Sequence, residues 1–240
     1  MAETNKANVS LRRWALAITL IFAPIAMGAA ATSPPSATAL LFDANHLANI
    51  TKGDPLTYRF ERTVSDPKLL GEAFADDIRL GVVNDGPSGT REVAVNVFTG
   101  ERARPEQRID GMTGNPLLVV FLDRAVNNLS MLAGGNRPYL KQKIKMSLAE
   151  RAKVEPVEID YKGKKVAGSR VSVTPFVGDP NALKMMGYDG AVFQIVVSDA
   201  VPGHFVDFSS HYESPMKDSP RLDERIRLAG AGEIKAGAAK

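Results

Sequence analysis

The middle of the chain, from Asn115 to Ala152, repeats its apolar residues with the period of a helix, whereas the segments on both sides alternate with a period of two. Pro116 suits the first turn of a helix, and Gly134 can end it without a steric clash. A second helix can begin near Pro138. The sequence therefore predicts one helix pair set between two blocks of strands.

The first predicted helix has one apolar face. Phe121, Leu122, Ala125 and Leu129 recur along it at helical spacing, with polar residues on the opposite side. A stripe of this kind packs against a sheet. If the sheet curls away from the helices, the same four side chains are the expected lining of an apolar ligand cavity.

Strand-like alternation occurs in seven segments around the helix pair. Strands in runs, with the helices grouped together, favour an α+β fold and an antiparallel sheet of about seven strands with the helix pair packed on one face. A curled sheet that encloses a cavity against the helices is also consistent with this pattern. The segments are residues 57–64, 76–83, 91–99, 154–161, 165–176, 191–197 and 204–212.

Residues 1–39 have the pattern of a cleaved signal peptide. Two arginines at 12 and 13 precede an apolar run from Trp14 to Met27, and small residues allow cleavage after Ala31 or Ala39. The run is shorter than the roughly 20 residues of a membrane span, so an uncleaved anchor is the weaker alternative. The chain has no cysteine. Export without disulfides predicts a periplasmic location.

The remaining chain divides into two parts. Residues 40–213 are predicted to form a single α+β domain, and residues 214–240, which are charged and then rich in alanine and glycine, are predicted to be a disordered tail. The formal charge of the whole chain is +3. A charge this small predicts no binding to nucleic acid.

The search for catalytic chemistry finds no established motif. The chain lacks a nucleophile elbow, a zinc-protease helix, a phosphate-binding loop and a dinucleotide fingerprint. His204 and His211 are seven residues apart in one predicted strand, so their side chains point to opposite faces. His46 beside Asp43 is a weak metal candidate. We therefore expect no catalytic residue, no metal and no cofactor; a hydrolase that uses scattered Asp, Glu and His residues is the alternative.

The predicted strands carry charged residues on their polar side. Such a face is either simply hydrated or forms a groove for a polar ligand. The residues on it are Arg59, Glu61, Arg79, Glu158, Asp160 and Arg170.

The second predicted helix is basic. Arg137, Lys141 and Lys145 stand four residues apart on one face, beside the apolar stripe of the same helix. A basic amphipathic helix can rest on anionic lipid headgroups. The alternative is an ordinary surface helix whose lysines keep the protein in solution.

Three turn and cap motifs resemble an uncharacterised family of small exported proteins of proteobacteria. They span residues 113–116, 133–139 and 198–203. That family has no established activity, so the resemblance implies export and no site residue. The predicted architecture is also similar in outline to the LolA-type periplasmic carriers. Together these features predict a non-enzymatic envelope protein that binds an apolar or amphiphilic ligand, or an envelope partner, with peripheral contact to an anionic membrane as a further expectation.

Overall fold

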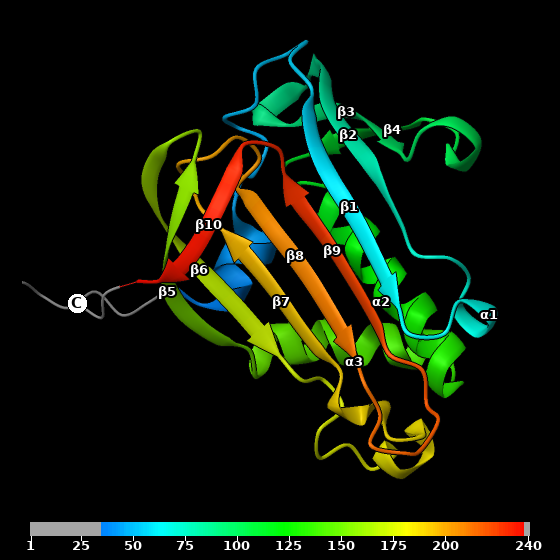
Figure 1. Ribbon diagram of the computed structural model, residues 1–240. Coiled ribbons are helices and arrows are strands. Elements are labelled where there is room, and N and C mark those ends of the chain that lie inside the picture. The colour runs from blue at the N-terminus through cyan, green and yellow to red at the C-terminus, as the bar shows by residue number, and fades with distance from the viewer. Residues whose placement is uncertain (1–34, 238–240) are drawn as a thin grey trace, which may run out of the picture. The chain divides into compact units, whose positions relative to one another are not determined.

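Ten antiparallel strands form one sheet in the computed structural model, which describes residues 35–237 (Figure 1). The strand order is β10-β5-β6-β7-β8-β9-β1-β2-β3-β4. The strands are β1 (Leu56–Val64), β2 (Phe74–Asp85), β3 (Arg91–Val97), β4 (Gln107–Met112), β5 (Lys153–Tyr161), β6 (Lys164–Val173), β7 (Val192–Val197), β8 (Phe205–Tyr212), β9 (Leu222–Leu228) and β10 (Ala231–Ala236). Residues 1–34 of the predicted signal peptide lie outside the described residues, and only its last five, 35–39, lie within them.

The helices are grouped together, as the sequence predicts. They are α1 (Pro67–Leu70), α2 (Leu117–Ala133) and α3 (Arg137–Glu150). Single helical turns occur at Ala39–Asp43, Pro87–Gly89, Gly100–Arg102, Ala182–Met185 and Tyr188–Gly190. The α+β class, the antiparallel sheet and the central helix pair are therefore confirmed, with more strands than expected.

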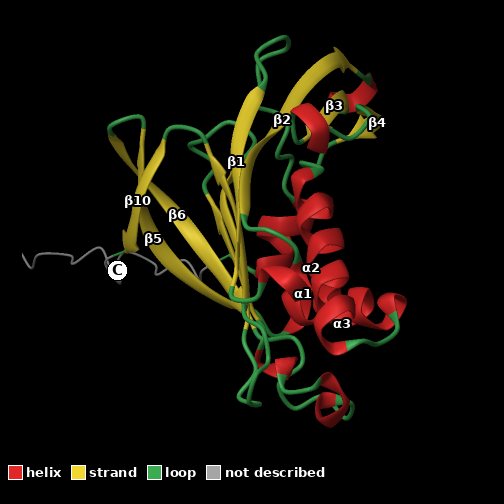
Figure 2. Ribbon diagram, turned by 45° about the vertical axis from the view of Figure 1, so that its right-hand side comes forward, coloured by secondary structure: helices red, strands yellow, loops and turns green. Residues whose placement is uncertain are grey.

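The helix pair covers one face of the sheet (Figure 2). Phe121 of α2 is 3% exposed, and its ring centroid lies 5.1 Å from that of Phe208 in β8 and 6.2 Å from that of Phe193 in β7. Leu140 and Ile144 of α3 are buried in the same core. Because the helix stripe and the inner strand faces are both apolar, packing them together removes both from water.

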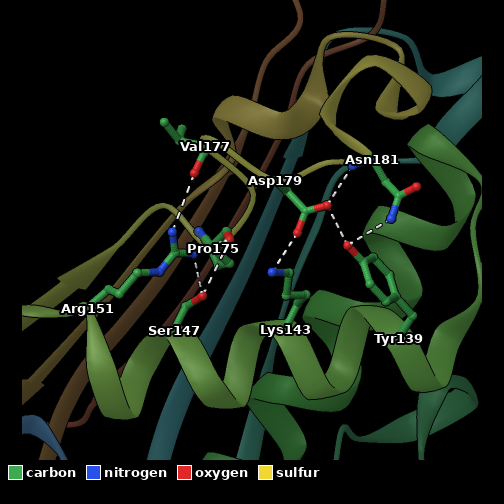
Figure 3. A network of polar contacts seen from close by, with 8 residues as sticks. All are labelled: Tyr139, Lys143, Ser147, Arg151, Pro175, Val177, Asp179 and Asn181. Carbon is green, nitrogen blue, oxygen red and sulfur yellow. Dashed lines mark hydrogen bonds and ion pairs between the residues drawn. The ribbon is translucent and has the colours of Figure 1, made fainter.

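A polar network fastens α3 to the loop that follows β6 (Figure 3). Lys143 forms a 2.7 Å ion pair with Asp179, which also accepts hydrogen bonds from the Tyr139 hydroxyl and the Asn181 amide. Burial alone would raise the pKa of Asp179, but these donors hold it at about 2. Arg151 donates to the Pro175 carbonyl at 2.6 Å. Lys143 of α3 and Arg151, the residue that follows the helix, thus hold α3 against this loop.

The segment after residue 213 is folded, contrary to the prediction of a disordered tail. β9 lies in the middle of the sheet between β8 and β1, and β10 forms one edge. Leu222, Ile226 and Leu228 of β9 are buried. The domain therefore extends past residue 213 to the end of the described chain.

The inward face of β9 also carries a charge. Glu224 accepts two hydrogen bonds from Arg124 of α2, at 2.9 and 2.5 Å, and contacts the guanidinium of Arg62 in β1. Arg62 donates further bonds to Asn128 Oδ1 at 3.1 Å and to the Leu70 carbonyl at 3.2 Å. A buried carboxylate is stable only when it is paired in this way. This acidic residue interrupts the apolar alternation of β9, which explains why the strand is missed in the sequence.

Two further strands depart from the prediction. β4 forms between the predicted strand 91–99 and the helix pair, in a polar segment where no strand was predicted and only Ile109 and Met112 are half-buried. β10 follows β9 after a two-residue turn but pairs with β5, on the other side of four intervening strands. A two-residue turn is too short to pass four flat strands spaced about 4.8 Å apart, so the sheet curls and β10 lies over the face that the helices leave open (Figures 1 and 2).

We expect Glu224→Ala to lower the free energy of unfolding by about 3–5 kcal/mol, because the buried Arg62 and the half-buried Arg124 lose their shared counter-ion. The matched control is Glu233→Ala, which removes a surface ion pair with Lys235 and should cost less than about 1 kcal/mol. Both values come from urea unfolding. A loss below about 1 kcal/mol for Glu224→Ala would show that the pairing does not hold β9 in the sheet.

Candidate functional site

An apolar groove of about 550 Å³ lies between α2 and the strands β3 and β4. Its floor is aliphatic. Val119 of α2 is 51% exposed, Val120 is half-buried, and Ile109 and Met112 of β4 face them in a half-buried state. The groove forms because α2 packs on β8 and α3 on β6, in the middle of the sheet, and the pair does not cover the β3–β4 end completely.

Charged side chains stand around this apolar floor. Arg104, Arg124 and Arg137 line the groove together with one acid, Asp123. Arg104 lies in the loop between β3 and β4, and its side chain forms no ion pair with any residue of the described chain. The groove thus combines an apolar floor with an excess of positive charge, an arrangement that suits an amphiphile.

The four residues predicted to line a ligand cavity lie in α2, which also forms one wall of the apolar groove, but they pack toward the sheet. Phe121, Ala125 and Leu129 are at most 3% exposed and pack in the core, and Leu122 is half-buried. None of the four lines the apolar groove. Their role in ligand binding stays a prediction.

The three basic residues of α3 lie on the surface, as the sequence predicts. Lys141 forms a 3.2 Å ion pair with Asp123 of α2, and Arg137 contacts Asn127, which is also in α2. Lys145 is exposed. Contact of this face with an anionic membrane stays a prediction, although the pairing of Lys141 with Asp123 reduces the net charge available for it.

A second groove, of about 650 Å³, lies on the open face of the sheet between β10 and the strands β6 to β9 and β1. The pairing of the strands brings its lining residues side by side, since successive cross-strand neighbours across β6 to β9 are Arg170, Val196, Asp207 and Arg227. Glu61 and Arg170, predicted for a polar face, both line it. Glu158 and Asp160 do not, because their neighbour Ile159 occupies the groove side of β5 beside Ile234.

The buried acid of this polar groove is paired with two arginines. Asp207 is almost buried and accepts from Arg225 Nε at 2.7 Å, with Arg227 Nε at 3.2 Å. Burial raises the pKa of Asp207, and the two arginines oppose that rise. Asp207, Arg225 and Arg227 were not singled out in the sequence, because two of them lie in the segment expected to be disordered. Asp207 is therefore compensated inside the protein, whereas Glu61 and Arg170 of the same lining form no ion pair among the described residues.

His211 is the histidine of the polar groove, and carboxylates occupy both of its ring nitrogens. Nδ1 lies 2.6 Å from Asp223 and Nε2 lies 3.3 Å from Glu213. The hydrogen bond with Asp223 is the main cause that raises the pKa of His211. Because both ring nitrogens face carboxylates, neither is free to take a proton from a nucleophile. The geometry therefore gives the hydrolase alternative no general base here.

His46 and His204 lie together, which the sequence did not predict. Their ring centroids are 5.4 Å apart. His46 Nε2 donates to the Leu40 carbonyl at 2.8 Å, and Nδ1 accepts from the Asn115 amide at 3.3 Å. Because both nitrogens have these partners, the ring is neutral with its proton on Nε2. Burial lowers the pKa of both histidines.

The turn motifs at residues 113–116 and 198–203 meet beside His46. Asn115 Nδ2 donates to the Gly203 carbonyl at 3.0 Å, and Asn115 Oδ1 accepts from the Leu117 amide at the start of α2. Gly203 has φ of +74°, and a Cβ there would lie 2.8 Å from Leu56. Both motifs therefore have structural causes.

Among residues 35–237, no group of three or more His, Asp or Glu side chains is placed to hold a metal ion. In the same part of the chain, no helix is long and apolar enough to span a membrane.

The three histidines of the chain should titrate in two directions from the ordinary pKa of 6.5. NMR should show His211 protonated above pH 6.5 and His46 and His204 neutral below it. Below about pH 6.5, His46 binds more protons in the unfolded state than in the folded state, so it lowers the stability of the fold as the pH falls. His211 does the reverse: it stabilises the fold at low pH, and this contribution is lost as the pH rises through its raised pKa. A His46 signal that titrates above His211 would contradict the assigned hydrogen bonds.

Comparison with known proteins identifies no family. No protein-family model matches the chain, and no characterised protein matches its sequence. The fold is weakly similar to MucB, solved in complex with MucA(peri), with 13% identity, 82% of this chain and 55% of the MucB chain covered, and a TM-score of 0.36. A LolA superfamily protein from Nitrosomonas europaea aligns over 86% of this chain and 96% of its own, with 9% identity and a TM-score of 0.19. The chain spans about half the length of the MucB chain, and neither similarity supports an argument about function.

Proposed function

We propose that this chain is an exported envelope protein that binds an amphiphilic ligand and catalyses no reaction. The observation that supports the proposal is the apolar groove between α2 and β3–β4. Its volume of about 550 Å³ is within the range of small-molecule sites. Exposing an aliphatic floor to water is unfavourable, so a ligand or partner that covers the floor gains free energy of binding.

The two other candidate sites fit a ligand less well. In the polar groove Asp207 is paired with Arg225 and Arg227, and His211 has both nitrogens occupied, so these groups are taken by neighbours within the protein. The interface between the helix pair and the sheet is filled by the core side chains around Phe121. The groove at the edge of that interface is therefore the place where an apolar chain can enter without disturbing the core.

An envelope partner is the second candidate occupant. β4 is the last strand of the sheet, and its outer edge has no neighbouring strand among the described residues. A free edge of this kind can pair with a strand of another protein. Such a partner would cover the apolar groove from the side of β4.

The binding test uses an uncharged amphiphile, glycerol monododecanoate, below its micelle concentration. Val119→Asp places a charge on the groove floor and should weaken binding by about tenfold or more, since burying an unpaired carboxylate is costly. Val177→Asp is the matched control, because both valines are 51% exposed and Val177 lies outside the groove. Native mass spectrometry and calorimetry provide the measurement. Equal binding by the parent and Val119→Asp would refute the groove as the site.

Export is the other part of the proposal, and its signal lies largely outside the described residues. Cleavage after Ala31 would keep the structured segment that begins at residue 35, whereas cleavage after Ala39 would remove Ala37, which is 5% exposed, and Thr38, which donates to the Ala149 carbonyl at 3.4 Å. We therefore expect N-terminal sequencing of the envelope fraction to begin at Thr32. A start at Leu40, or an intact Met1, would contradict this expectation.

A further inference from the structure

A second pocket, the arginine pocket, adjoins the apolar groove. It has a volume of about 470 Å³ and shares Arg104 and Arg124 with the groove, so the two hollows meet at these side chains. It is formed by the end of β1, the start of β2, the turn after β3 and the middle of α2. Its lining residues are Arg62, Leu70, Gly71, Glu72, Phe74, Phe98, Arg102, Arg104 and Arg124.

The base of the arginine pocket carries an uncompensated positive charge. Arg62 and Arg124 share one carboxylate, Glu224, so two positive charges less one negative charge leave one positive charge. The Glu224 side chain is only 4% exposed, and its oxygens are taken by these arginines. A charge in such a sheltered position is screened less by salt than one on the surface.

The rim adds two free cations. Arg102 and Arg104 are exposed, and neither forms an ion pair within residues 35–237. Glu72 is the one acid among the lining residues. Asp76 lies close to Arg102 but directs Oδ1 to the Thr99 amide and hydroxyl, at 3.1 and 2.7 Å.

The aromatic wall of the arginine pocket is held in a fixed conformation. Phe98 has φ of +69°, which is unfavourable for a bulky residue, and the hydrogen bonds of Thr99 to Asp76 hold the turn in place. The Phe98 ring packs against Phe74 with centroids 5.4 Å apart, and the guanidinium of Arg102 lies 4.8 Å above Phe74. Stacking through its face leaves the N–H edge of Arg102 free to bind an anion.

We propose that the arginine pocket binds the phosphate head of a single-chain amphiphile whose alkyl chain lies in the apolar groove. This assignment rests on the proposed function, which places the chain in that groove. A phosphate monoester presents three terminal oxygens, which matches positive groups arriving from the base and from two points of the rim. A carboxylate, with two oxygens, satisfies fewer of them. The contact between the two hollows at Arg104 and Arg124 lets one molecule fill both.

The test compares ligands with the same dodecyl chain and different heads, using the full chain after export. They are dodecyl phosphate, dodecanoate, uncharged glycerol monododecanoate and dodecyltrimethylammonium. We expect dodecyl phosphate to bind about tenfold or more tightly than the uncharged ligand, as for one additional charge-assisted interaction, with dodecanoate between them and the cation weakest. Raising the salt concentration should reduce the preference for phosphate and leave the uncharged ligand unaffected.

Two double variants test the site. Arg102→Gln/Arg104→Gln should weaken dodecyl phosphate about tenfold. Because Arg104 also lines the apolar groove, the uncharged ligand is compared on Arg102→Gln alone; Arg102 lines only the arginine pocket, so this change should alter that affinity by less than about twofold. The control, Arg79→Gln/Arg221→Gln, removes two exposed arginines that line neither hollow and should leave every affinity unchanged.

The outcomes separate the two proposals. The uncharged ligand could bind in a way that depends on Val119 while the protein shows no preference for phosphate, or no effect of Arg102→Gln/Arg104→Gln. Either result would overturn the arginine pocket as a phosphate site and leave the proposal of the apolar groove standing. Failure of every dodecyl ligand to bind the parent protein would overturn both. Dodecanoate binding as tightly as dodecyl phosphate, with the same dependence on Arg102 and Arg104, would overturn the assignment of a phosphate head.

Discussion

The pairing of Glu224 with Arg62 and Arg124 connects the parts of this structure that are furthest apart in the sequence. The carboxylate comes from β9, near the end of the chain, and its partners come from β1 and from the middle of α2. Each of the three charges would be costly to bury alone. The insertion of β9 into the sheet and the seating of α2 on it therefore depend on each other.

The same pairing shapes the candidate binding region. By holding Arg124 against Glu224, with its guanidinium 4.3 Å from the Phe60 ring, the core fixes the residue that separates the apolar groove from the arginine pocket. An arginine held by a bidentate contact and a stacked ring loses little further entropy when a ligand approaches. A structural ion pair thus also supplies part of the rigid wall of a binding site.

The sequence predicted those elements whose apolar residues recur without interruption. The helix pair and the seven segments with clear alternation are all present, because each buries one regular face against the core. β9 was missed because Glu224 occupies a core-facing position, and β4 because only Ile109 and Met112 mark its inner side. The candidate groove was missed with β4, since that strand forms one of its walls.

By itself, the sequence determined the fold class, the position of the helix pair and the face of α2 that is buried, since these follow from local periodicity. Only the tertiary structure decided that the last segment completes the sheet, that a groove opens at the edge of the helix–sheet interface, and that Arg104 and Arg124 stand between two hollows. The physical reason is that a charged residue in a core position is stable only with partners from distant parts of the chain, and no local pattern records where those partners lie.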